Sequence, residues 1–336
     1  VGEQIALIKA LVQKGYAYTT KNGVYFETSK YKEYGKLGGL DLEGPREARI
    51  VEDTEKKRPE DFALWKKDRA LGWQSPWGKG FPGWHTECVA MIFALLGRQI
   101  DIHMGGIDLR AIHHNNEIAQ AESATGKEFA RFFVHNAHIT VEGKKISKSL
   151  GNTIYLHNVV ERGFSPRALR YWFLTGHYRT PMNFTWEALE GASRALNRLY
   201  KYFFESLPDK EGPLHMPFVK AFTDAVSHDL DTPKAIALMW DFIKDEKVSP
   251  ASKRSTLLFA DSVLGLGLDR RRTEVLKVSV VKANDLPEEI RVLVERREKA
   301  RTNKQFDEAD FLREELKNKG YVVEDSPEGP VVRKVQ

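Results

Sequence analysis

The sequence predicts an α/β fold that contains the second half of a doubly wound parallel sheet, followed by helical and α+β parts. Three observations indicate this fold class. Over residues 84–140, two helical stretches alternate with two short apolar strands, the pattern of parallel strands joined by helical crossovers. Residues 187–268 show the apolar periodicity of a small helical bundle. Residues 287–333 combine two charged helices with two strand-like runs around a turn.

Composition limits the class of protein. The chain has 336 residues, of which 41% are hydrophobic and 29% charged, so we expect two or three globular domains. No apolar run reaches the ~20 residues that span a bilayer, and we expect no membrane partner. The single cysteine, Cys88, excludes an internal disulfide and favours a reducing compartment, which predicts a cytoplasmic protein. The net charge of +5 fits a polyanionic partner.

The beginning of the chain predicts an inserted connective domain. A helical apolar face over Ile5–Val12 ends at Gly15, and a strand over Val24–Phe26 follows it. Residues 27–60 are polar and charged, which is typical of irregular surface structure. We therefore expect a connective insertion over residues 1–76. Because the first residues already have the pattern of a helix interior, we also expect that the chain lacks its native start.

The half-sheet is predicted over residues 77–150. Its helices and strands alternate in the order Trp84–Leu96, Gln99–Met104, Ile112–Thr125 and Arg131–Thr140. In sheets of this kind, ligands bind at the carboxyl ends of the strands. The functional residues are therefore expected just after each strand.

A candidate zinc site follows the first of these strands. Gly105 and Gly106 end the strand, and His113 and Glu117 lie four residues apart on one face of the next helix. With the Cys88 thiolate they provide sulfur, nitrogen and oxygen donors and leave a fourth position open. The pattern also fits a solvated helix face and a cysteine that is only a small buried hydrophobe. The adjacent glycines and three further histidines nearby favour the metal site.

A lysine-rich loop over Val141–Asn152 follows the second strand. Its lysines and hydroxyl side chains, Lys145, Ser147, Lys148 and Ser149, suit a clamp for phosphate oxygens. The same run of charges also fits a solvated turn.

The remainder of the chain divides by composition into four stretches. Residues 151–190 contain a helix rich in arginine and aromatic residues, Pro166–Thr175. Residues 191–268 are the predicted bundle, and the polar stretch 269–286 is predicted to be a linker. Residues 287–336 form the predicted small α+β domain, which either contacts nucleic acid or is a solvated cap.

Several of these motifs resemble class I aminoacyl-tRNA synthetases. Lys145-Ile-Ser-Lys-Ser149 is similar to their KMSKS signature, with Ile146 in place of methionine. Other segments resemble cysteinyl-tRNA synthetase in particular, namely Phe81–Cys88, Asp101–Gly106, His113–Gln120, Asp61–Lys66, Ser75–Gly78 and Asp231–Pro233. The resemblance covers essentially the whole chain.

The resemblance implies an enzyme with a Rossmann-type catalytic domain. That family uses ATP with Mg²⁺ to convert L-cysteine to cysteinyl-adenylate, and then transfers the cysteine to tRNA(Cys). Its Zn²⁺ is held by two cysteines, a histidine and a glutamate, and the thiolate of the substrate joins the metal. Cys88, His113 and Glu117 match three of these ligands. The resemblance also implies a monomer.

Further roles follow from the resemblance. Lys148 and Lys145 would be catalytic and, with Ser147 and Ser149, would bind ATP; the second lysine would neutralise the leaving pyrophosphate. His103 would be a further catalytic residue, and the substrate pocket would be lined by Trp84, His103 and His114. Residues 151–190 would contact the tRNA stem, and residues 287–336 would bind the anticodon.

The sequence also departs from the family pattern. A second cysteine and the HIGH motif are absent, and Phe81, Met104 and Asn115 stand where the family usually has Arg, Gly and Glu. We therefore expect the isolated chain to be inactive.

Two alternative functions stay open. One is the cysteine ligase of mycothiol biosynthesis, which shares the zinc and adenylate chemistry but lacks the anticodon-binding domain. The other is a non-catalytic paralogue that binds tRNA or zinc.

Overall fold

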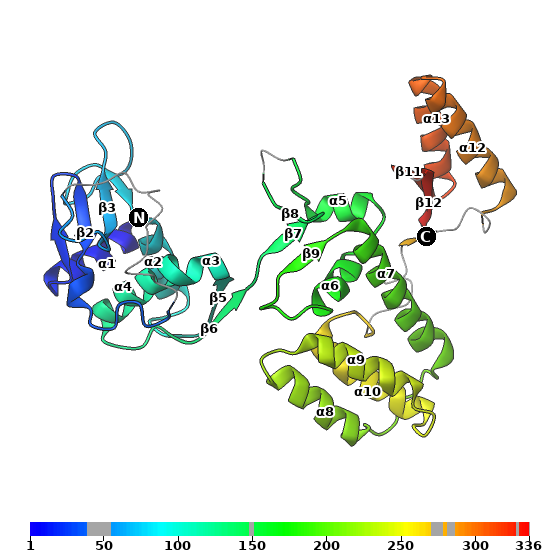
Figure 1. The fold of residues 1–336 in the computed structure, drawn as a ribbon, viewed down its shortest axis with the longest axis horizontal. Coiled ribbons are helices and arrows are strands. Elements are labelled where there is room, and N and C mark those ends of the chain that lie inside the picture. The colour runs from blue at the N-terminus through cyan, green and yellow to red at the C-terminus, as the bar shows by residue number, and fades with distance from the viewer. Residues whose placement is uncertain (39–54, 148–150, 270–277, 281–285, 327–328, 336) are drawn as a thin grey trace. The chain divides into compact units, whose positions relative to one another are not determined.

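The structure is a computed structural model that describes residues 1–38, 55–147, 151–269, 278–280, 286–326 and 329–335 (Figure 1). The chain divides into two compact units, Val1–His138 and Ile139–Gln336. The mixed α/β class predicted from the sequence is confirmed. Among the described residues, every helix is too short or too polar to traverse a bilayer.

The first unit begins with helix α1 (Gly2–Gln13) and a small antiparallel sheet. The sheet has the order β1-β2-β3-β4, with β1 at Ala17–Thr19, β2 at Gly23–Phe26, β3 at Phe62–Lys67 and β4 at Gly80–Pro82. Leu11, Phe26 and Trp65 are fully buried between the helix and the sheet. Burial of these large apolar side chains stabilises the part predicted to be a connective insertion.

The second part of this unit holds the predicted parallel pair. It consists of α2 (Trp84–Leu95), β5 (Ile100–Gly106), α3 (Ile107–Leu109), a π-helical turn (Arg110–His114), α4 (Asn115–Thr125) and β6 (Ala130–Asn136). Strands β5 and β6 pair in parallel, as the alternation predicts. Helix α4 ends at Gly126, whose φ of 70° is a left-handed conformation that glycine adopts readily. Ile102, Met104 and Phe132 leave an apolar surface exposed on the two strands.

One predicted strand is wrong. The predicted strand Arg131–Thr140 is two strands, because β6 ends at Asn136 and β7 (Ile139–Val141) pairs with a different partner, β9. Between them the Asn136 side chain donates to the Ala137 carbonyl, a local bond that competes with continued strand pairing. The first compact unit ends at His138, between these two strands, and the lysine-rich loop lies in the second unit.

The second unit opens with a three-stranded sheet in the order β8-β7-β9, where β8 is Lys144–Lys145 and β9 is Met182–Phe184. The β7–β8 turn uses Glu142 (φ 50°) and Gly143 (φ 72°), the two left-handed residues that a tight hairpin requires. Helices α5 (Leu156–Glu161) and α6 (Pro166–Leu174) connect β8 to β9.

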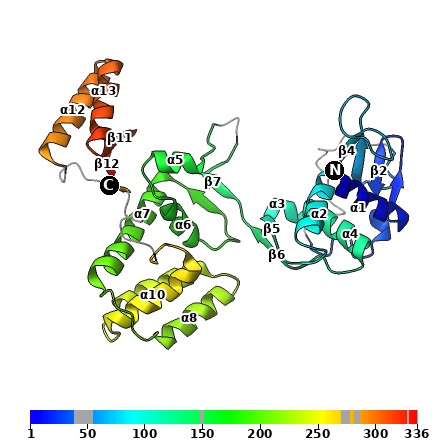
Figure 2. The same ribbon diagram turned by 180° about the vertical axis from the view of Figure 1, so that it is seen from behind.

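The stretch predicted to be a bundle consists of helices. They are α7 (Trp186–Lys201) with a π-helical end (Tyr202–Ser206), α8 (Met216–Ser227), α9 (Thr232–Lys244) and α10 (Pro250–Leu264). Figure 2 shows α10 beside α8, and Phe203, Phe222 and Leu257 are fully buried in the shared core. Side chains of Thr185, Asp231 and Ser249 cap the starts of α7, α9 and α10, which satisfies backbone N–H groups there.

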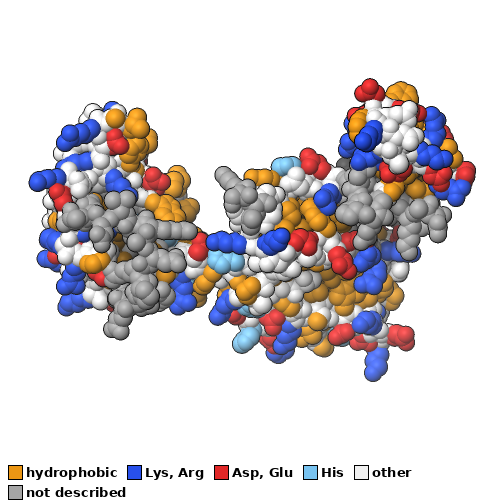
Figure 3. All heavy atoms as spheres, turned by 45° about the horizontal axis from the view of Figure 1, so that its top comes forward, with side chains coloured by type: hydrophobic (Ala, Val, Ile, Leu, Met, Phe, Trp, Pro, Cys, Tyr) orange, Lys and Arg blue, Asp and Glu red, His pale blue; other side chains and the backbone are white. Residues whose placement is uncertain are grey.

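The last part of the chain has the predicted α+β content. It contains β10 (Val278–Val280), α12 (Glu288–Thr302), α13 (Phe306–Asn318), β11 (Tyr321–Ser326) and β12 (Gly329–Val335). The stretch 269–286 was expected to be a linker, but it contributes β10, which pairs with β12. On the face shown in Figure 3, basic and acidic side chains are interspersed in each unit, so the excess positive charge is spread over this face.

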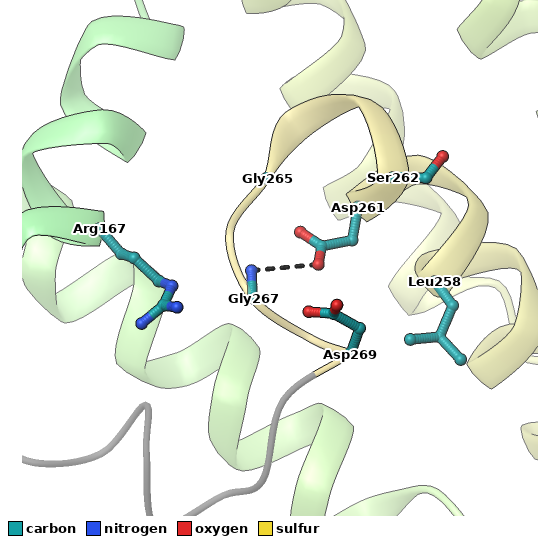
Figure 4. A pocket seen from close by; sticks show the side chains of 7 residues that line it. All are labelled: Arg167, Leu258, Asp261, Ser262, Gly265, Gly267 and Asp269. Atoms are coloured by element: carbon teal, nitrogen blue, oxygen red, sulfur yellow. Dashed lines mark hydrogen bonds between the residues drawn. The ribbon is translucent and has the colours of Figure 1, made fainter.

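A buried carboxylate organises the end of α10 (Figure 4). Asp261 accepts hydrogen bonds from the backbone N–H groups of Leu266 at 2.6 Å, Gly267 at 3.0 Å and Leu268 at 2.7 Å. Gly267 has a φ of 89°, and a Cβ atom there would lie 2.5 Å from Nε of Arg167. The turn therefore needs both the carboxylate and the glycine to pack closely against α6.

Candidate metal and substrate site

Three predicted ligands come together at the start of α4. Cys88 lies on α2, His113 in the π-helical turn and Glu117 in the first turn of α4. One potential ligand atom from each lies within 4.8 Å of the other two. Nε2 of His113 is 3.0 Å from Oε1 of Glu117. Thiol, imidazole and carboxylate therefore converge, as the four-residue spacing of His113 and Glu117 predicts for one helix face.

The Glu117 carboxylate fits a bound cation. The residue is fully buried, and Oε2 accepts a hydrogen bond from Nε2 of His103 at 2.6 Å. Oε1 is buried and makes no hydrogen bond of good geometry, although Nε2 of His113 lies 3.0 Å from it. Burial acts to raise the pKa of Glu117, but the adjacent His103 and His113 rings outweigh it and lower the pKa to about 2. A buried, ionised oxygen that lacks a well-placed donor is costly unless a cation lies beside it.

The Cys88 thiol is protonated at neutral pH without a metal ion. Burial, together with the negative charge of Glu117, raises its pKa to about 11. A metal ion that coordinates the sulfur removes this proton, because the thiolate is the ligand. The negative charge of Glu117 disfavours the thiolate form of Cys88. A divalent cation between them would stabilise both charged groups.

His85 is a partner of His113 that the sequence analysis did not include among the site residues. Nδ1 of His85 lies 2.8 Å from Nδ1 of His113, so one ring donates and the other accepts. Burial, with the neighbouring His113, lowers the pKa of His85 to about 4, so the ring is neutral at pH 7. When His113 donates from Nδ1, the lone pair of Nε2 points toward Cys88 and Glu117. The signal in the sequence was the three-residue spacing of His85 and Cys88 on one helix face.

The residues expected to line the pocket surround this cluster. The Trp84 and His113 rings have centroids 4.3 Å apart, and Trp84 remains 60% exposed. His103 and His114, with Glu117, form a second set of potential ligand atoms within 4.8 Å of one another. Nδ1 of His114 is held by Nε2 of His135 at 2.8 Å. The exposed indole beside buried polar rings makes one side of the cluster accessible to a small polar molecule.

The lysine-rich loop lies in the second unit. Lys145 is exposed on β8, and the side chain of Asn152 closes the base of the loop. Its amide donates to the Lys145 carbonyl at 3.0 Å and accepts from the Ser147 N–H at 2.9 Å. Lys148 and Ser149 lie outside the described residues. The phosphate clamp therefore stays a prediction.

Known proteins are similar in sequence to this chain over nearly its whole length. Residues 1–194 match the catalytic domain of class I (C) tRNA synthetases, and residues 283–333 match the anticodon binding domain of cysteinyl-tRNA ligase. Cysteine–tRNA ligase 1 of Burkholderia lata is 42% identical over 98% of this chain and 69% of its own length. The chain belongs to the cysteine–tRNA ligase family.

Two further relatives agree with this assignment. Cysteine–tRNA ligase of Caldicellulosiruptor saccharolyticus is 41% identical over 100% of this chain and 75% of its own length. Cysteine–tRNA ligase of Thermus thermophilus is 42% identical over 98% of this chain and 72% of its own length. The family is a group of class I aminoacyl-tRNA synthetases, for which ATP, cysteine and tRNA are the expected partners. The Cys88, His113 and Glu117 cluster lies within the region matched to the catalytic domain.

The histidines of the ligase site predict acid sensitivity of the metal-free chain. Burial lowers the pKa of His85 and of His114 to about 4, below the ordinary 6.5. Between pH 4 and pH 6.5 the unfolded chain binds more protons than the folded chain. The contribution of these two histidines to the free energy of unfolding is therefore fully present above pH 6.5 and is lost as the pH falls toward 4. For His114, which is 1% exposed, the loss is at most about 3 kcal/mol. Thermal unfolding of the first unit in the presence of a chelator measures this loss of stability. An unchanged unfolding midpoint between pH 7 and pH 4 would contradict the prediction.

Proposed function

We propose that Cys88, His113 and Glu117 hold a Zn²⁺ ion that selects cysteine by its thiol group, as part of a cysteine–tRNA ligase. The main support is the convergence of a thiol, an imidazole and the buried carboxylate of Glu117, whose potential ligand atoms lie within 4.8 Å of one another. Zinc in proteins is bound by cysteine sulfur, histidine nitrogen and carboxylate oxygen, the three donors present here. Three protein ligands leave one position of a tetrahedral site for a substrate. The family assignment supports the same chemistry.

Each residue has a distinct part in this proposal. Cys88 gives up its thiol proton, Glu117 is already ionised, and His113 uses Nε2 while Nδ1 is paired with His85. His103 holds the second carboxylate oxygen, which fixes the direction of the first. Trp84 lies beside the cluster, where it would limit the size of the amino acid. Bound zinc would supply a soft Lewis acid at the open position.

Selection by zinc explains how cysteine is separated from serine. The two amino acids differ mainly by sulfur in place of oxygen, and a pocket separates such similar shapes poorly by size. A thiol loses its proton on the metal far more readily than a hydroxyl does, and zinc binds thiolates strongly. The chain therefore needs no second site to remove wrongly activated serine.

We further propose that the lysine-rich loop binds ATP. Lys145, Ser147, Lys148 and Ser149 would contact phosphate oxygens, with Mg²⁺ bound to the nucleotide, and Lys148 would neutralise charge on the leaving pyrophosphate. Support comes from the similarity to the KMSKS signature and from Asn152, which ties the base of the loop. His103 is proposed as a further catalytic residue and His114 as part of the pocket.

The anticodon match supports one of the related ligases over the other. Residues 283–333 match the anticodon binding domain of cysteinyl-tRNA ligase, and this favours tRNA(Cys) over a sugar amine as the acceptor. We therefore favour the tRNA ligase over the ligase of mycothiol biosynthesis.

We also propose a monomer in the cytoplasm. The single cysteine supports a reducing compartment, and the monomer rests on the family resemblance.

Calorimetric titration of the purified chain with cysteine and serine tests the zinc proposal without requiring turnover. The zinc-loaded chain is expected to bind cysteine, and to bind serine at least ~100-fold more weakly, because a hydroxyl is a poor zinc ligand at neutral pH. After removal of zinc, the preference for cysteine is expected to disappear. Equal affinity for both amino acids in the zinc-loaded chain would overturn the proposal.

Binding of tRNA tests the role of residues 283–336. The full chain is expected to bind a tRNA(Cys) transcript at least ~10-fold more tightly than a transcript with three altered anticodon bases, because each lost base contact costs about 1–3 kcal/mol. A chain without residues 283–336 is expected to bind both transcripts equally and to keep its zinc. Filter binding at fixed salt measures both affinities. Undiminished discrimination by the shortened chain would contradict the anticodon role.

A further inference from the structure

The turn that carries His113 and His114 has an unusual backbone. Residues Arg110–His114 form a single π-helical turn between α3 and α4. Such a turn displaces carbonyl groups from the ordinary helical ladder, and turns of this kind often occur at functional sites. The backbone N–H of Asn115 donates to Ile112 O at the end of this turn. Carbonyl groups displaced in this way are open to side-chain donors.

The side chain of Asn115 provides such donors. It is 1% exposed, and its amide nitrogen lies 3.1 Å from the Arg110 carbonyl oxygen and 3.0 Å from that of Ala111. The same nitrogen lies 3.2 Å from the Gly38 carbonyl oxygen, while the amide oxygen accepts from the Leu37 N–H at 3.2 Å. One buried amide thus joins the π-helical turn to a segment that lies 77 residues earlier in the chain.

A second side chain, that of Arg110, also joins the π-helical turn to the segment Leu37–Gly38. Nε of Arg110 donates to the Leu37 carbonyl at 3.0 Å. Gly38 has a φ of 78°, and a Cβ atom there would lie 2.7 Å from Nη2 of Arg110. A side chain at Gly38 would be strained by this positive φ, and the Arg110 guanidinium would have to move away from it.

We infer that Asn115 is a positioning residue for the metal site: it fixes the π-helical turn that presents His113, and it couples this turn to Leu37–Gly38. A carboxylate of the same length accepts the Leu37 N–H but cannot donate to the carbonyls of Arg110, Ala111 and Gly38. This inference rests on the proposed zinc site for its function, whereas the order of the turn does not depend on a metal ion.

Two measurements on the full chain test the inference. The first is amide hydrogen exchange over residues 110–116 in the metal-free chain, which reports the order of the turn. The second is titration with Co²⁺, whose visible absorption reports the geometry of its ligands. Asn115→Ala and Asn115→Asp are both expected to speed exchange in this segment, to change the Co²⁺ spectrum and to weaken Co²⁺ binding by about 10–100-fold, the usual effect of outer-shell changes.

Matched variants separate positioning from general stability. Asn116→Ala removes an equally buried amide that accepts from the Tyr34 hydroxyl, and the Co²⁺ spectrum is expected to stay unchanged. Gly38→Ala is expected to act like Asn115→Ala without altering the helix. Gly15→Ala imposes the same left-handed strain at a φ of 77° in open space and is expected to have no effect on Co²⁺ binding.

The outcomes are distinct. Unchanged exchange over residues 110–116 in Asn115→Ala would overturn the inference, whatever the metal does. An unchanged Co²⁺ spectrum and affinity would also overturn it, even though the zinc proposal would stand. If the unaltered chain binds neither Zn²⁺ nor Co²⁺, the zinc proposal fails, and the role of Asn115 toward a metal fails with it.

Discussion

Replacing Cys88 by serine is expected to lower the zinc affinity of the chain by more than ~100-fold. Outer-shell changes alone cost about 10–100-fold, and this substitution removes a direct ligand of the proposed site. A serine hydroxyl cannot replace the thiolate, because it keeps its proton at neutral pH. Metal analysis after dialysis against a weak chelator measures the bound zinc. Co²⁺ adds a second readout: Cys88 is the only cysteine, so any sulfur-to-cobalt absorption band belongs to it.

Met91→Ser is the matched control for this experiment. Met91 lies on the same helix, α2, and is exposed, so the substitution removes a sulfur atom without touching the cluster. Its zinc content is expected to equal that of the unaltered chain. Retention of zinc and of the cobalt band by Cys88→Ser would exclude Cys88 as a ligand and would move the metal, if bound, to the second set formed by His103, His114 and Glu117.

Replacing Asp261 by alanine is expected to destabilise the end of α10 by at least about 3 kcal/mol. Three backbone N–H groups in a buried turn would lose their acceptor, and each unsatisfied group costs about 1–3 kcal/mol. Leu266 and Leu268 on this turn are almost fully buried, so water replaces the carboxylate only if the turn opens. Amide hydrogen exchange over residues 250–268 gives the local free energy of opening and restricts the measurement to this element.

Two substitutions serve as comparisons for Asp261→Ala. Asp261→Asn keeps one acceptor oxygen and is expected to lose less than the alanine variant. Asp269→Ala removes a neighbouring exposed carboxylate and is expected to change stability by less than about 0.5 kcal/mol. Equal exchange rates in Asp261→Ala and the unaltered chain would show that the three bonds contribute little. Zinc binding is expected to be the same in all three variants, because Asp261 belongs to the second unit.

The sequence alone predicted the elements whose signals are local. The helix ended by Gly126, the parallel strands β5 and β6, and the two helices and hairpin at the end of the chain follow from periodicity, glycine positions and turn residues. The grouping of His113 with Glu117 follows from helical geometry, because residues four apart share a face. The motifs that resemble cysteinyl-tRNA synthetase also lie in short, continuous segments.

Tertiary structure alone decided the features that depend on distant pairings. The stretch Arg131–Thr140 was predicted as one strand, but β6 pairs with β5 whereas β7 pairs with β9, and these different partners divide it after Asn136. Pairing with β12 makes a strand of Val278–Val280, which lie within the stretch expected to be a linker. His85 became the partner of His113 only when α2 packed against α4, and Asn115 meets Leu37 only across 78 residues. Local sequence encodes which residues share a helix face, but packing between elements determines which buried polar atoms meet, as His85 meets His113 and Asn115 meets Leu37.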